Sequence, residues 1–139
     1  YQGQMTSVQI GNCLWQVSSA NKTLVLGALP ALASTDYLFR VGDFVQAGLY
    51  SYIVTADVQR GSGSTVNVPI HRNLLTALTS ATPAVAGEFG TTVSMGGTTY
   101  TGVTFPVVLR EYPTYNLVPM ANDSFISWSG SFQALEQVL

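Results

Sequence analysis

The feature that most constrains the fold is a regular succession of short apolar runs separated by turn residues, clearest over 38–75. Apolar and polar side chains alternate along 50–59 and again along 65–70, and the glycine–serine segment 60–64 separates the two runs. Alternation with a period of two is typical of a strand buried on one face, and glycine and serine between such runs favour a turn. One apolar face comprises Tyr52, Val54, Ala56 and Val58, and the next comprises Val66, Val68 and Ile70. We therefore expect two strands here, joined by a hairpin turn at 60–64.

The same pattern continues through most of the chain. Segments 7–19 and 22–31 are predicted as opening strands, and 37–48 as strands with a bend at Gly42-Asp43. Gly96-Gly97 predicts a hairpin that leads into a longer strand containing Val103, Phe105, Val107 and Leu109, in which Pro106 indicates an edge or a bulge. Residues 124–139 are predicted as a half-buried terminal strand interrupted by Gly130.

Helical signals are nearly absent. Only 72–81 offers a helical window, of two turns at most, and Pro83 ends it, so we expect a short helix or a loop there. Short strands at regular spacing are typical of a sandwich or a small barrel. The predicted class is all-β with at most one short helix, and 24–83 could close as a five-stranded Greek-key barrel of the OB type.

Charge is unusually scarce. The 139 residues fit one domain, or one domain plus a piece of another, and only 9% of them are charged, against about 25% in an ordinary soluble domain. A surface so poor in charge favours burial against neighbouring molecules. The alternative is a monomer whose surface is polar but uncharged.

Several classes of function are disfavoured by composition. The net charge is −2 and the five basic residues are scattered, which argues against nucleic-acid binding. With one cysteine, Cys13, and one histidine, we expect no disulfide, no metal and no cofactor. Cys13 lies between apolar neighbours and is interpreted as a small buried thiol rather than a nucleophile. The longest apolar run, 24–33, is too short to span a bilayer, so we expect no membrane segment. A first residue of Tyr1 indicates a processed chain or a piece of a longer one.

No pattern assigns a catalytic site. His71 lacks a recognisable nucleophile and orienting carboxylate, so a structural or solvent-facing histidine is favoured. Asp43 and Asp57 could form a carboxylate pair, but an Asp after Gly42 is also a common turn former. The glycines of 60–65 are followed by no helix and no phosphate-binding lysine. We expect a protein that is not an enzyme.

Aromatic residues offer a candidate interface instead. Most of them have the inward parity of strands and are expected in the core. Tyr112 and Tyr115 lie in a proline-flanked connection and are best placed to contact a partner. Trp128 and Phe132, on the apolar parity of the last strand, complete the candidate interface. Exposed tyrosines on an uncharged polar surface also suit an alternative function, a carbohydrate-binding module that attaches a particle or an enzyme to a cell surface.

The order of the pieces resembles one known family. "VGDFVQAGLYSYIVTADVQRGSGSTVNVPI", then the segment 72–81, two more strands and the closing "SFISWSGSFQALEQVL", is similar to the distal tail proteins of long-tailed bacteriophages. In that family a tube-type β-sandwich carries an added OB-like barrel, after which the chain returns to the sandwich. The resemblance implies a lead-in or sandwich strands at 1–20, a barrel domain at 21–95 and closing strands at 96–139.

The resemblance also implies a function. Distal tail proteins are non-catalytic and form a hexameric ring that joins the tail tube to the host-recognition tip. The expected partners are copies of the same chain, the tail tube protein and the tail hub protein, and the expected location is the virion, after synthesis in the host cytoplasm. A host glycan is the ligand that the alternative function requires.

Overall fold

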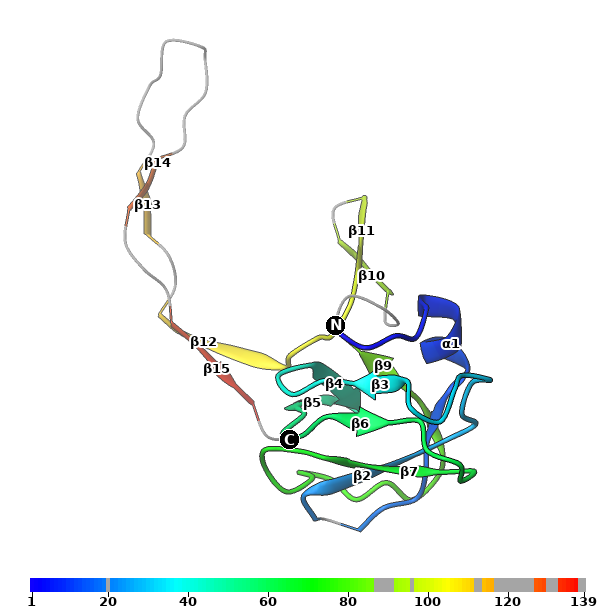
Figure 1. Ribbon diagram of the computed structural model, residues 1–139. Helices are drawn as coiled ribbons and strands as arrows, with labels where there is room; N and C mark the ends of the chain where they lie inside the picture. The colour runs from blue at the N-terminus through cyan, green and yellow to red at the C-terminus, as the bar shows by residue number, and fades with distance from the viewer. Residues whose placement is uncertain are drawn as a thin grey trace. The chain divides into compact units, whose positions relative to one another are not determined.

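The computed structural model describes residues 1–19, 21–86, 92–95, 97–111, 114–116, 127–129 and 133–137. Their regular secondary structure consists of short strands in small antiparallel sheets and one short helix, which confirms the all-β class (Figure 1). The chain divides into two compact units, Tyr1–Phe105 and Pro106–Leu139. Each unit is described by itself.

The first unit contains one short helix and most of the strands. The helix is α1 (Ser7–Asn12), and the strands are β1 (Leu14–Trp15), β2 (Thr23–Gly27), β3 (Tyr37–Phe39), β4 (Phe44–Ala47), β5 (Tyr50–Ile53), β6 (Val58–Gln59), β7 (Val66–Pro69), β8 (Thr82–Pro83), β9 (Val85–Ala86), β10 (Thr92–Met95) and β11 (Thr98–Thr101). They form sheets in the orders β7-β2-β1-β8, β5-β4-β9, β3-β6 and β10-β11.

The helix lies where a strand was expected. Thr6 caps α1: its hydroxyl accepts a hydrogen bond from the Gln9 N–H at 3.3 Å, and the Gln9 side chain accepts one from the Thr6 N–H at 2.8 Å. This reciprocal capping box satisfies two N–H groups that the first turn otherwise leaves unpaired. The strand predicted over 7–19 is therefore wrong over α1, and within this range only β1 is a strand.

The segment 72–81 is a loop rather than a helix. The Leu75 N–H donates to the Tyr52 hydroxyl at 3.0 Å, and Leu78 forms an isolated bridge with Ser18. Contacts with other parts of the unit thus take up backbone groups that a helix would pair internally. The loop alternative is confirmed.

One of the two predicted hairpins is confirmed. β10 and β11 pair antiparallel, with Met95 opposite Thr98, as the predicted hairpin requires. The hairpin predicted at 60–64 is wrong, because β6 pairs with β3 whereas β7 pairs with β2. The turn there carries the chain from one sheet to another. Gly61 supplies the positive φ, +59°, and the Arg60 guanidinium donates to the carbonyls of Pro30, Gly61 and Gly63.

An aromatic column forms the centre of the core. Trp15 stacks on Phe39 with ring centroids 5.9 Å apart, and Tyr1 packs edge-on against the same Phe39 at 6.0 Å. The Trp15 indole N–H donates to the Gln46 carbonyl at 2.7 Å, which links β1 to β4. Because Trp15 and Phe39 are fully buried, this column connects three sheets of the first unit.

The second unit contains two two-stranded antiparallel sheets. Its strands are β12 (Val107–Glu111), β13 (Thr114–Asn116), β14 (Ser127–Ser129) and β15 (Gln133–Glu136), with β12 beside β15 and β13 beside β14 (Figure 1). We call the β12–β15 pair the ribbon. The predicted single strand through Val103 and Leu109 begins only at Val107, since Pro106 cannot donate to a ladder. Of the predicted terminal strand, β14 and β15 are described, and the interruption expected at Gly130 lies outside the described residues. Ala134 and Leu135 are exposed rather than half-buried.

The division into two compact units does not test the expected domains. β1 hydrogen-bonds to β2 and β8, so part of 1–20 shares a sheet with strands of 21–95. Along the chain, the boundary between the two compact units falls after Phe105. The barrel and sandwich assignments stay predictions.

Replacing Trp15 tests the aromatic column. Trp15→Phe keeps a ring against Phe39 but leaves the buried Gln46 carbonyl without its donor, and we expect a loss of about 1–3 kcal/mol in the free energy of unfolding. Urea titration followed by circular dichroism measures this loss. The control is Val17→Ala, at a side chain 64% exposed, for which we expect a change within about 0.5 kcal/mol. Equal stability of the two variants would contradict the assigned role of Trp15.

Candidate functional site

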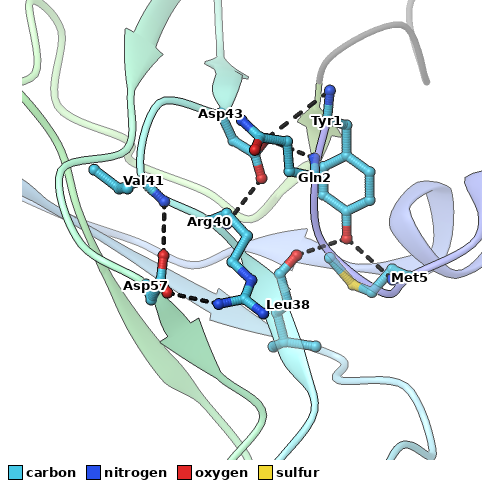
Figure 2. A network of polar contacts seen from close by, with 8 residues as sticks. All are labelled: Tyr1, Gln2, Met5, Leu38, Arg40, Val41, Asp43 and Asp57. Atoms are coloured by element: carbon cyan, nitrogen blue, oxygen red, sulfur yellow. Dashed lines mark hydrogen bonds and ion pairs between the residues drawn. The ribbon is translucent and has the colours of Figure 1, made fainter.

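The two candidate carboxylates both bond to the turn between β3 and β4: Asp43 lies in that turn, whereas Asp57 lies just before β6 (Figure 2). Asp43 is 2% exposed and accepts backbone N–H bonds from Gln2 at 2.7 Å and from Arg40 at 2.9 Å. Asp57 accepts the Val41 N–H at 2.9 Å and pairs with the Arg40 guanidinium at 2.7 Å. The turn-forming interpretation of Asp43 is confirmed, and Asp57 holds the other side of the same turn.

Asp57 is held in its ionised form. The Val41 N–H, followed by the Arg40 guanidinium, lowers the pKa of the Asp57 carboxyl below its ordinary value. A carboxylate stabilised in this way is a poor proton donor near neutral pH. The geometry of Asp43 and Asp57 therefore suits fastening the turn rather than paired acid–base chemistry.

The first five residues form a strap across β3 (Figure 2). The Tyr1 hydroxyl donates to the Leu38 carbonyl at 2.6 Å, and the Gln4 N–H donates to the Tyr37 carbonyl at 2.8 Å. Burial raises the pKa of Tyr1 to about 12, so the phenol keeps its proton and remains a donor. Gly3 allows this close approach, because a Cβ there would overlap the Leu38 carbonyl oxygen and the Tyr1 hydroxyl.

His71 has a structural role in this arrangement. Its Nδ1 accepts the Ile53 N–H at 3.0 Å, and its own backbone N–H donates to the Ile53 carbonyl at 3.0 Å. The exposed imidazole thus completes the edge of β5, and its ring lies 6.3 Å from that of Tyr52. An Nδ1 occupied by a backbone donor is not available as a general base.

Cys13 is fully buried, as expected. Its Sγ lies 4.0 Å from the Met5 Sδ, and burial raises the pKa of the thiol. A raised pKa disfavours the thiolate, which is the nucleophilic form. The prediction of a small buried thiol is confirmed.

Apolar side chains are exposed on the ribbon. Val108 lies opposite Leu135, and these two share one face, whereas the neighbouring Val107 belongs to the other face because successive side chains alternate. Val107, Val108 and Leu135 are 50%, 47% and 50% exposed. Each face of the ribbon therefore carries apolar side chains in contact with solvent. Adjacent valines at 107–108, which break the apolar–polar alternation, are the sequence signal that could have identified this surface.

A second exposed apolar surface lies in the first unit. Phe44 and Phe105 meet edge-to-face with ring centroids 6.0 Å apart, and are 42% and 48% exposed. Thr104 fixes the chain beside them: its N–H donates to the Gln46 side chain at 3.0 Å, and its carbonyl accepts from the Ser51 hydroxyl at 2.8 Å. We call Phe44 and Phe105 the phenylalanine pair.

The predicted interface residues are only partly placed. Tyr115 and Trp128 are backbone partners across β13 and β14, so the structure brings these two positions together. Tyr112 and Phe132 lie outside the described residues. The positions of these four residues do not test the predicted interface or the glycan-binding alternative. Both stay predictions.

No family model matches the chain, and no curated protein or solved structure matches it significantly. Among the described residues, no three or more His, Cys, Asp or Glu side chains gather as a metal site, and no helix is long and apolar enough to cross a membrane. The most distinctive feature of the described residues is their two exposed apolar surfaces.

Neutralising Asp43 tests the buried carboxylate. An Asn has one acceptor oxygen, so Asp43→Asn leaves one of two N–H groups, from Gln2 or Arg40, without its partner. We expect a loss of about 1–3 kcal/mol in the free energy of unfolding, measured by urea titration. The matched control is Asp36→Asn, because Asp36 accepts a single side-chain bond of this kind, from the Ala33 N–H, and an Asn oxygen can replace it. A control as destabilised as Asp43→Asn would contradict the assignment.

The lowered pKa of Asp57 predicts how the stability of the fold changes with pH. Because its pKa is lowered in the folded chain, its ionised form stabilises the fold above the ordinary value of 3.8, and this contribution is lost as the pH falls through the folded pKa. Asp57→Asn should therefore be less stable than the parent chain at neutral pH, and the difference should narrow as the pH falls below 3.8. Urea titrations across this range measure the difference. If the difference in stability between the two chains widened on acidification, the ionised Asp57 would not be stabilising the fold.

Proposed function

We propose that the protein is a non-enzymatic structural subunit of an assembled particle, specifically of a bacteriophage tail tip or baseplate. In this role a ring of identical chains joins the tail tube to the host-recognition apparatus, with the tail tube and tail hub proteins as neighbours. The resemblance to distal tail proteins supplies the ring, the hexameric number and the location in the virion.

The observation that carries the proposal is the exposed apolar ribbon. Two-stranded hairpins are at best marginally stable alone in water. Val108 and Leu135 form a cross-strand apolar pair, yet both are about half exposed among the described residues. Covering such side chains by another subunit would stabilise the ribbon, which is a property expected of an assembling protein.

The chemistry of the candidate groups agrees with a structural role. Asp43 and Asp57 bind backbone N–H groups of one turn, and His71 binds the edge of β5. Only 9% of the residues are charged, which lowers the free-energy cost of removing water when a surface is buried. These features support a protein whose surfaces are covered by neighbours.

Assembly can be measured directly. We expect the full-length protein to elute as an oligomer in size-exclusion chromatography with light scattering, and antibody labelling to place it at the tail tip of purified particles in electron micrographs. Its mass should be a whole multiple of the chain mass, because closed rings contain identical subunits. A strictly monomeric protein that is missing from tails would contradict the proposal.

A further inference from the structure

We propose that the β12–β15 ribbon is an exchange arm, covered by the Tyr1–Phe105 unit of a second copy of this chain. The inference rests on the proposed function and adds to it which surfaces meet. The arm contributes Val108 and Leu135 from one face, and the second copy contributes the phenylalanine pair.

The distribution of charge favours this occupant. Residues 1–105 balance four basic against four acidic residues, so the net charge of −2 falls on Pro106–Leu139. In the latter, Arg110 stands against Glu111, Asp123 and Glu136. A net-negative arm is repelled by nucleic acids and by anionic lipids, and two such arms repel each other. The neutral first unit of another copy imposes no such repulsion.

The receiving surface is held in place before any contact forms. Gln46 and Ser51, which are 7% and 3% exposed, bind Thr104 and so fix the chain next to Phe105. Ordering such a surface on binding costs little conformational entropy. The phenylalanine rings demand no hydrogen-bond partner, and neither do the valine and leucine of the arm, so the two surfaces match in chemistry.

Contact between two different surfaces has a consequence for symmetry. Each copy gives one arm and receives one, so the contact is heterologous when it runs in a single direction around an assembly. Such contacts generate a ring when the rotation closes. The arm thereby supplies a physical means for the ring assembly proposed above.

Disulfide trapping tests the contact. Full-length Val108→Cys and Phe44→Cys chains carrying different affinity tags are co-produced and oxidised, so that a mixed disulfide reports contact between two copies. We expect the mixed disulfide in several-fold higher yield than in a control that replaces Phe44→Cys by Val8→Cys, at a side chain 70% exposed on α1. The native Cys13 is fully buried and leaves the background low. Yields equal to the control, or bonds only between two Val108→Cys chains, would overturn the inference.

A second pair of variants distinguishes a failure of the exchange arm from a failure of the proposed function. Val108→Thr with Leu135→Thr keeps the β propensity of the arm but adds hydroxyls, and we expect light scattering to show dissociation at several-fold higher protein concentration than for the parent chain. The control is Val8→Thr with Val17→Thr, at two side chains exposed outside the arm. An oligomer unaffected by the arm variants would overturn the exchange arm but leave the assembly standing. A parent chain that is monomeric at every concentration would instead defeat the proposed function.

Discussion

The first unit depends on the environment of Gln46. Its backbone carbonyl accepts the buried Trp15 N–H, while its side-chain amide bonds both Thr104 and the Gly48 carbonyl. One residue of β4 therefore connects the aromatic core with the chain that leads to the ribbon. Because Gln46 is nearly fully buried, its polar groups depend on these protein partners, and loss of a bond there costs more free energy than at an exposed site. The phenylalanine pair keeps its position through the same residue.

The turn between β3 and β4 shows how a chain with few charges uses them. Asp43 is buried and accepts backbone N–H bonds, whereas Asp57 is partly exposed and pairs with Arg40, which also lies 3.4 Å above the Tyr37 ring. Exposed ion pairs contribute little by themselves. Here the carboxylates also satisfy the N–H groups of Arg40 and Val41. Their main contribution is to fix the direction in which the chain enters β4, and through β4 the position of Gln46.

Sequence reasoning reached the class of structure because strand alternation is local. The apolar parity of Val66, Val68 and Ile70 and the Gly96-Gly97 turn follow from neighbouring residues, and both agree with the structure. Pairing partners are not local, since a period of two does not say which strand lies alongside, and for this reason the turn at 60–64 was mistaken for a hairpin. The helix α1 was missed although Thr6 and Gln9 have the spacing of a capping box. The turn role of Asp43 was accessible, and the adjacent valines at 107–108 indicate apolar side chains on both faces of a strand. Whether those side chains are covered was not accessible, because burial depends on what packs above a strand.

Low charge and exposed apolar area together distinguish an assembling surface from an ordinary one. Scattered exposed apolar side chains such as Val8 and Val17 are normal on any protein. On the ribbon, however, Val108 and Leu135 are directly paired, and Val107 places apolar area on the opposite face as well. A strand pair that is apolar on both sides is the pattern of a sheet covered on both faces. In the proposed exchange arm, this cover comes from the neutral first unit of the next copy.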